Sequence, residues 1–204
     1  RVNLPNYFYA YAHVKLKSNS LNIFNSYKNN YSLESDRSGI GYRNSWLSLQ
    51  LGRGTQNWGA NHGIELSLYE QSKSYNYSLL GLDFNKIRVK YLHGYLEKDS
   101  THFNRFLTAR GIELTNKKSI ILGISEIVIY SGFNRHFDFS YLNPMSSHLE
   151  IELNDRTNMI GTGNGNGIWQ LSFDYFSEYN IRLSLNFLID EFVLDKEQIL
   201  NGKS

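Results

Sequence analysis

The stretch GIWQLSFDYFSEYNIRLSLNFLIDEF, residues 167–192, indicates most clearly which fold this chain adopts. Apolar and polar side chains alternate along it, a period of two that is typical of a β-strand with two different faces. The apolar set is Trp169, Leu171, Phe173, Tyr175, Ile181, Leu183, Leu185, Phe187 and Ile189. The polar set is Gln170, Ser172, Asp174, Arg182, Ser184, Asn186 and Asp190. The apolar face needs a cover, which is either a protein core or lipid.

The same alternation recurs along most of the chain. It is clearest in residues 7–17, 46–53, 63–70 and 86–97. Turn-forming residues separate these runs, at 28–32, 35–39, 81–85, 114–119 and 177–180. The pattern predicts an all-β, antiparallel fold of roughly eleven or twelve strands, many of them about 9–11 residues long, the length a tilted strand needs to cross a bilayer.

Two longer segments, Gly52–Gly63 and Asn143–Gly167, are predicted to be loops. Within the second of them, Ser146–Asp155 is predicted to form either a short helix or another strand. Short turns at one end of a sheet and long loops at the other are typical of an outer-membrane barrel.

Composition limits the classes of protein to consider. A chain of 204 residues favours one domain, residues 1–204. The absence of Cys excludes disulfides and thiolate metal sites, and a net charge of +2 without any basic run argues against a nucleic-acid partner. No apolar run approaches the roughly 20 residues of a transmembrane helix. The start at Arg1 and the polar end after Phe192 suggest that one or both ends of the domain are missing.

Two architectures satisfy the alternation. In a soluble β-sandwich the apolar face is buried against a second sheet, whereas in a transmembrane barrel it faces lipid and the polar face lines the lumen. The long strands and the aromatic residues near strand ends favour the barrel, because such residues form girdles at the membrane interfaces. A lipid-facing charge costs about 2–4 kcal/mol at the bilayer midplane, so charges should turn inward. We therefore expect an antiparallel transmembrane β-barrel of the outer-membrane type.

Some charged or titratable residues break the pattern. His93 and Glu97 are in phase with the apolar Ile87, and Glu126 is in phase with Ile124. Either a β-bulge shifts the phase, or these side chains lie near a membrane interface.

No motif predicts catalysis, a cofactor or a metal site. The six His residues are dispersed, without an HxxxH or HExxH pair, and there is no GxSxG sequence. The glycine-rich GTGNGNG, residues 161–167, lacks the Lys-Ser/Thr of a phosphate-binding loop, so we interpret it as a flexible loop or hairpin turn.

Arginine and tryptophan residues are the best candidates for a binding site. An indole ring can stack on a sugar, and a guanidinium can pair with a uronate carboxylate. The candidate glycan-binding residues are Arg53, Trp58, Arg105 and Arg110. The alternative is a girdle tryptophan together with charge pairing inside a lumen. The residues proposed for such pairing are Arg110 with Glu126, and Arg182 with Asp190.

Six segments follow one another between Leu51 and Phe192: GRGTQNWGANHGIELSLYEQSKSYNYSLL, YLHGYLE, RFLTARGIEL, LGISEIVIYSG, YLNP and NFLIDEF. This ordered set resembles the capsule assembly Wzi family. The positions that match the family's pattern are Gly52, Arg53, Trp58, Gly59, Arg105, Arg110, Glu126, Tyr141, Asn143, Pro144, Asp190 and Phe192. The sequence departs from it at Asn61-His62, and the chain is shorter than a typical member.

The resemblance implies an outer-membrane barrel of a Gram-negative bacterium that organises capsular polysaccharide as a lectin-like factor. The implied partners are the lipid bilayer and surface polysaccharide, with envelope proteins unidentified. We expect the chain to bind glycan without catalysis. A porin-like channel for small solutes or oligosaccharides is the main alternative, and an outer-membrane enzyme is a weaker one.

Overall fold

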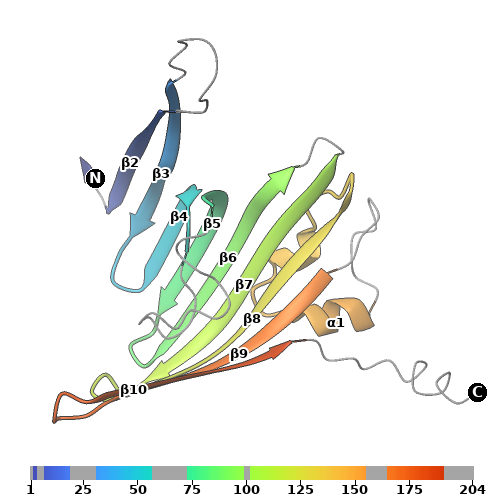
Figure 1. The fold of residues 1–204 in the computed structure, drawn as a ribbon. Helices are drawn as coiled ribbons and strands as arrows, with labels where there is room; N and C mark the ends of the chain where they lie inside the picture. Colours follow the sequence, from blue (N-terminus) through green and yellow to red (C-terminus); the bar gives the residue numbers. More distant parts are fainter. Residues whose placement is uncertain are drawn as a thin grey trace, which may run out of the picture.

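The computed structural model describes residues 2–3, 7–18, 31–56, 73–98, 102–154 and 165–190. These residues form one sheet of ten strands, in which each strand pairs antiparallel with the next along the chain (Figure 1). The predicted all-β antiparallel fold is confirmed. Within the described residues the sheet is open, because β1 and β10 each have a single neighbour. The strand predicted at residues 63–70 lies outside the described residues.

The first five strands are β1 (Val2–Asn3), β2 (Phe8–Ser18), β3 (Tyr31–Arg43), β4 (Leu47–Gly54) and β5 (Tyr75–Asp83). The other five are β6 (Ile87–Lys98), β7 (Phe103–Thr115), β8 (Ile120–Phe133), β9 (Gly165–Phe176) and β10 (Arg182–Asp190). Between β8 and β9 lie a single 3₁₀ turn, η1 (Phe139–Leu142), and a short helix, α1 (His148–Leu153). In the described part of the chain, no helix has the length and apolar character needed to cross a bilayer.

The structure corrects two details of the sequence analysis. Residues 35–39, predicted to be a turn, lie inside β3, where Asp36 is the extra residue of a β-bulge between the pairs His13–Arg37 and Val14–Ser35. Polar and glycine residues in a strand mark a bulge as readily as a turn. The predicted loop 143–167 contains α1, and β9 begins two residues before its end.

The two ends of the sheet differ in their connections. Turns of three to five residues join β3 to β4, β5 to β6, β7 to β8 and β9 to β10 at one end. Side-chain oxygens close two of them, since Asn44 Oδ1 accepts from the amide of Leu47 and Asn116 Oδ1 from that of Ile120. The other end carries the connections 19–30, 55–74, 99–102 and 134–164. We call these the short-turn end and the long-connection end.

The strand register gives the sheet one polar and one apolar face. Directly opposite residues share a face, so the pairing places Leu114, Leu122, Phe173 and Leu185 in one row across β7 to β10. The next row contains Ile112, Ile124, Leu171 and Phe187. The opposite face carries the polar residues Tyr9, Tyr11, Gln50, Tyr77, Arg88, Glu113, Gln170, Asp174 and Arg182, and is called the polar face below. Over β5 to β8 the same face also carries a buried apolar cluster that includes Leu92, Leu107, Ala109 and Ile127.

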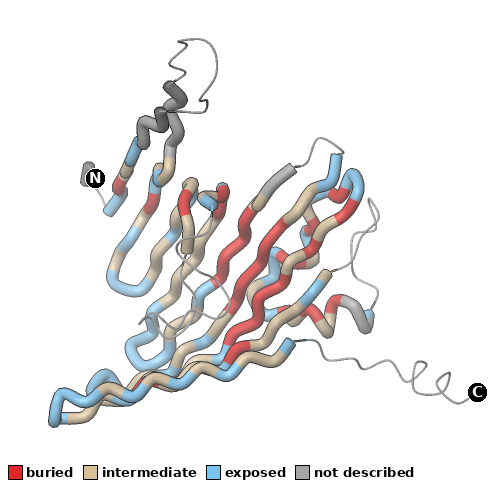
Figure 2. The backbone as a smooth tube through the Cα atoms, viewed as in Figure 1, coloured by how far each residue is buried: buried red, intermediate tan, exposed pale blue. Residues whose placement is uncertain are grey.

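Large apolar side chains remain uncovered over much of the apolar face. Along β9 and β10 most residues are intermediate or exposed, whereas buried residues gather on β6 to β8 (Figure 2). Each of the uncovered apolar side chains is 37–62% exposed, a high fraction for residues of this kind. We call this set the apolar band. Its members are Phe8, Val14, Ile40, Leu49, Leu51, Ile87, Ile112, Leu114, Leu122, Ile124, Leu171, Leu183, Leu185 and Phe187.

Residues 134–154, which include η1 and α1, cover the apolar face of β6 to β8 toward the long-connection end (Figure 1). The Tyr91 hydroxyl donates to the Tyr141 carbonyl oxygen at 2.6 Å, and Arg110 donates to the carbonyl oxygen of Asn143 at 3.1 Å. Tyr91, Arg110 and Glu126 form one register row on the same face as Ile112. This stretch, called the covering segment below, therefore lies on the apolar side of the sheet.

Glycines on the polar face allow tyrosine rings to lie flat over the strands. We expect Gly39→Ala to lower the free energy of unfolding by roughly 1–3 kcal/mol, the usual cost of overpacking. An added Cβ would lie 2.5 Å from the Leu51 carbonyl oxygen and 2.8 Å from the Tyr11 hydroxyl. Gly81→Ala is the matched control, because its Cβ would meet no atom closer than 3.6 Å. Urea unfolding measures both variants, and equal midpoints would contradict the tight packing.

Candidate functional site

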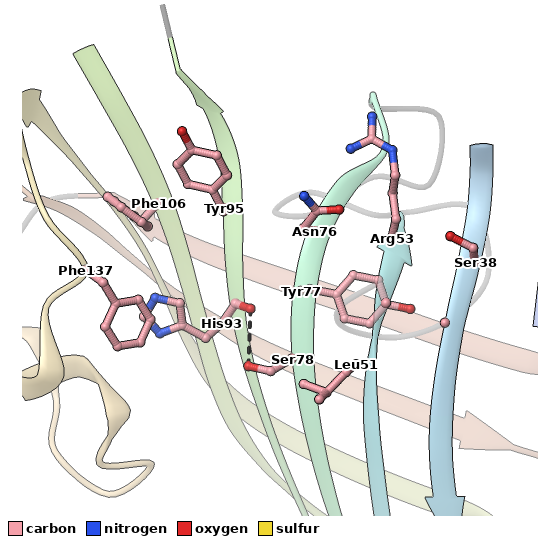
Figure 3. A pocket seen from close by; sticks show the side chains of 12 residues that line it. Ser38, Leu51, Arg53, Asn76, Tyr77, Ser78, His93, Tyr95, Phe106 and Phe137 are labelled. Carbon is pink, nitrogen blue, oxygen red and sulfur yellow. Dashed lines mark hydrogen bonds between the residues drawn. The ribbon is translucent and has the colours of Figure 1, made fainter. Parts of the chain in front are cut away.

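A groove of about 560 Å³ opens on the apolar side of the sheet, beside the covering segment (Figure 3). Strands β3 to β7 form its floor, and Phe137 of the covering segment forms one wall. One register row runs along it: Ser38, Arg53, Asn76, Tyr95 and Phe106. The groove thus lies toward the long-connection end, at the edge of the apolar band, whose member Leu51 also lines it.

The groove combines aromatic rings with a cation, an amide and hydroxyls. Arg53 and Asn76 project from paired positions on neighbouring strands, with Tyr95 next in the row (Figure 3). A guanidinium recognises a carboxylate with two parallel hydrogen bonds, and aromatic faces offer flat apolar contact area. This set of groups suits a sugar that carries a carboxylate.

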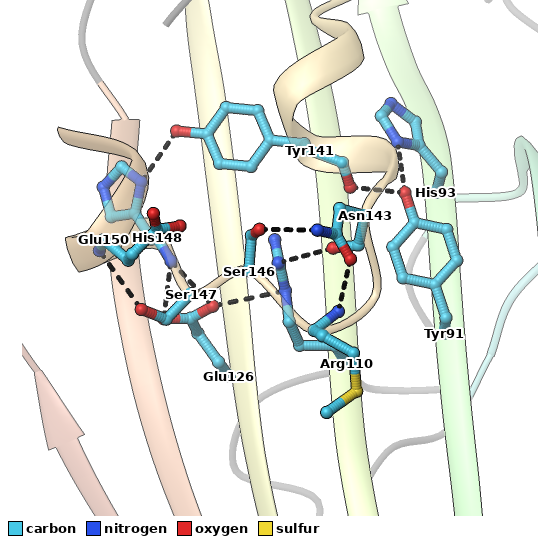
Figure 4. Close-up of polar contacts among 11 residues, drawn as sticks. Tyr91, His93, Arg110, Glu126, Tyr141, Asn143, Ser146, Ser147, His148 and Glu150 are labelled. Atoms are coloured by element: carbon cyan, nitrogen blue, oxygen red, sulfur yellow. Dashed lines mark hydrogen bonds and ion pairs between the residues drawn. The ribbon is translucent and has the colours of Figure 1, made fainter. Parts of the chain in front are cut away.

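A buried ion pair holds the covering segment to the sheet (Figure 4). Arg110 Nε lies 3.2 Å from Glu126 Oε2, and the two side chains are only 8% and 2% exposed. Both Glu126 carboxylate oxygens accept from the His148 amide at 3.0 Å. Arg110 in turn donates to the Asn143 carbonyl oxygen. Strands β7 and β8 therefore hold both the start of α1 and the residue that follows η1.

A second buried cluster lies beside it, centred on His93 (Figure 4). His93 Nδ1 lies 3.1 Å from the Tyr91 hydroxyl, and its Nε2 lies 3.0 Å from the Tyr130 hydroxyl. Since the Tyr91 hydroxyl already donates to the Tyr141 carbonyl oxygen, it accepts from Nδ1–H. The Tyr130 hydroxyl accepts from the Asp138 amide at 3.3 Å, which leaves its own proton to donate to Nε2. With Nδ1 donating and Nε2 accepting, the imidazole is neutral. His93 is therefore a structural link between the sheet and the covering segment.

Two further contacts complete the packing of the covering segment. Arg135 donates to Asp138 at 3.2 Å, and both side chains are buried. The His148 ring packs against Gly165 and Gly167, where an added Cβ would lie 2.6 Å and 2.9 Å from the imidazole. The end of the glycine-rich stretch at residues 161–167 thus gives α1 a close approach to β9.

The sequence analysis did not assign Tyr91, Tyr141 or His148 to a site. The available signal was the break in alternation at His93 and Glu126, which place polar groups on an otherwise apolar face. The structure shows neither a shifted phase nor exposure at these two positions. Instead, both side chains are buried beneath the covering segment.

The polar face carries its own charge pairs. Arg182 Nη2 lies 3.0 Å from Asp174 Oδ1, and Arg88 Nε lies 3.6 Å from Glu113 Oε2. Arg182 therefore pairs with Asp174 in place of Asp190. Arg182 and Asp190 lie at opposite ends of β10, roughly 26 Å apart at 3.3 Å per residue.

The four predicted glycan-binding residues do not converge. Arg53 lines the groove, whereas Arg105 alternates with Phe106 and so lies on the opposite, polar face. Arg110 is buried in its ion pair, away from any ligand at the surface. Trp58 lies outside the described residues. Among the three described members of the set, only Arg53 lines the groove, where it joins Asn76, Tyr95, Phe106 and Phe137.

Comparisons of the chain with known protein families, with curated proteins and with solved structures gave no match.

Proposed function

We propose that this chain forms the wall of an outer-membrane β-barrel that binds surface polysaccharide without catalysis. The apolar band carries the proposal, since its members lie on one face, on every strand from β2 to β10 except β5, and each is 37–62% exposed. Soluble monomers rarely expose contiguous apolar patches larger than a few hundred Å². A closed sheet of this kind pairs all of its backbone N–H and C=O groups, so its apolar face can contact lipid without leaving such groups unsatisfied.

Exposed aromatic residues at the short-turn end support the same orientation. They are Tyr7, Trp46, Phe84 and Tyr179, each beside or within a turn. Aromatic girdles mark the interfaces of membrane barrels, and short turns face the periplasm. The long-connection end, with the groove, then faces outward from the cell.

The groove supports binding of an acidic glycan. Arg53 offers a guanidinium, and Tyr95 and Phe106 offer rings, at the end that this orientation directs outward. The ordered segments that resemble the capsule assembly Wzi family favour the same function. The ligand class that we propose is therefore a uronate-containing surface polysaccharide.

We expect Arg53→Gln to weaken binding of a uronate oligosaccharide by about tenfold or more, because a hydrogen bond to a charged group contributes about 1.5–3 kcal/mol. Arg53→Lys should recover only part of the affinity, since an ammonium lacks the planar fork. Arg43→Gln, which removes an exposed charge at the short-turn end, is the matched control. Calorimetric titration of detergent-purified protein measures all three. Equal affinities across the set, or no binding by the unmodified chain, would refute the groove as the glycan site.

A porin-like channel is a second candidate, favoured by the polar face. Tyr11 and Tyr77 share a hydrogen bond of 3.0 Å, and the Gln50 amide donates to both hydroxyls. Together with the charge pairs of β6 to β10, these hydroxyl and amide groups suit contact with water inside a lumen. Conductance in planar bilayers separates the two functions: steady open steps support a channel, and silence supports a closed glycan-binding barrel.

A further inference from the structure

The apolar band extends farther along β2 than along β7. On β2 it extends from Phe8 to Val14, about 20 Å along the strand, whereas on β7 it contains only Ile112 and Leu114, about 7 Å apart. The lipid-facing band of a membrane barrel is about 25 Å tall. On β6 to β8, the covering segment lies over the part of the apolar face between the band and the long-connection end.

The covering segment buries some of its polar residues and exposes some of its apolar residues. Asp138, Ser146 and His148 are buried against the sheet, together with Tyr141 and Ile151. Phe139, Leu142 and Met145 are instead 72%, 40% and 74% exposed. Water does not favour exposed apolar side chains of this size.

The exposed apolar residues adjoin the band. Asn143 lies directly over Arg110, whose side chain donates to its carbonyl oxygen. Ile112, a member of the band, is the next residue on that face of β7, roughly 7 Å along the strand. Leu142 directly precedes Asn143 and Met145 follows it by two residues, so the segment continues the apolar surface outward from the band.

We propose that the covering segment inserts Phe139, Leu142 and Met145 into the lipid leaflet on the long-connection side. It thereby completes the lipid-facing surface of β6 to β8 and shields the buried Arg110–Glu126 pair from hydrocarbon. The occupant of this surface is lipid acyl chain. The inference rests on the proposed function, because it requires that the apolar band lie in a bilayer.

Spin-label accessibility in liposomes tests the insertion directly. The chain contains no Cys, so single Cys variants label at one position only. The test positions are Phe139→Cys and Met145→Cys, both exposed enough to accept a label without disturbing the polar contacts beneath. Leu185→Cys reports on the band, and Lys117→Cys, in the turn between β7 and β8, reports on water.

We expect labels at 139 and 145 to be more accessible to oxygen than to a water-soluble nickel chelate, as at 185 and in contrast to 117. Nickel access at 139 and 145 with oxygen access at 185 would overturn the insertion and leave the barrel intact. Nickel access at 185 would overturn the proposed membrane function and the insertion with it. Protection from both reagents at 139 and 145 would indicate a protein partner and overturn the lipid assignment.

Discussion

Replacing Glu126 by Ala should lower the free energy of unfolding by about 3–5 kcal/mol, the usual cost of removing one partner of a buried ion pair. The Arg110 guanidinium would remain buried without its counter-charge. The His148 amide would also lose both of its acceptor oxygens. Urea unfolding of the reconstituted protein measures the loss. The covering segment should detach first, so limited proteolysis should cut within residues 134–154.

A double variant separates the charge from the packing. Arg110→Met combined with Glu126→Leu removes both charges and keeps apolar volume, a replacement that is often neutral or stabilising. We expect it to recover part of the loss, with the remainder reflecting the unpaired His148 amide. If Glu126→Ala unfolds at the same urea concentration as the unmodified chain, the ion pair does not hold the covering segment.

Replacing Leu185 by Arg should destabilise the protein by about 2–4 kcal/mol in a bilayer, the cost of a lipid-facing Arg near the midplane. Leu185 lies in the row that contains Leu122 and Phe173, in the middle of β10, and is 56% exposed. If this face met water, the same change would alter stability by no more than about 0.5 kcal/mol, as surface substitutions usually do. The size of the destabilisation therefore shows whether lipid or water contacts Leu185.

Glu178→Arg is the control for the Leu185 variant, because it places the same side chain in the exposed turn between β9 and β10. Equilibrium folding into lipid vesicles at increasing urea concentrations measures both. A loss confined to Leu185→Arg supports lipid contact. Equal small effects at the two positions would place Leu185 in water.

Periodicity predicted the strands well, because alternation and turn chemistry are local properties of the chain. Alternation at residues 167–192 corresponds to β9 and β10, and residues 86–97 correspond to β6 with nearly the same bounds. The turn predicted at residues 35–39 was wrong, because a bulge and a turn use the same polar and glycine residues. For residues 146–155 the sequence did not decide between a helix and a strand. The structure has a helix there, and its first residue, His148, contacts Glu126 and β9.

The candidate site was less predictable, since it depends on where a connection folds back. Arg110 and Glu126 lie opposite each other in the register of β7 and β8, a pairing that follows from the turn between them. Nothing local indicates that residues 134–154 cover that pair, or that Phe137 forms a wall of the groove. The diagonal pairing of Arg182 with Asp174 likewise depends on the register of two strands.

A tryptophan scan along β10 tests most directly whether lipid covers the apolar face. The background replaces Trp46, Trp58 and Trp169 by Phe, and single Trp residues are placed at positions 183 to 187 in vesicles of brominated lipid. We predict fluorescence quenching by bromine at 183, 185 and 187, and quenching by aqueous acrylamide at 184 and 186. Acrylamide quenching at all five positions, or no bromine quenching at 183, 185 and 187, would contradict lipid contact with this face.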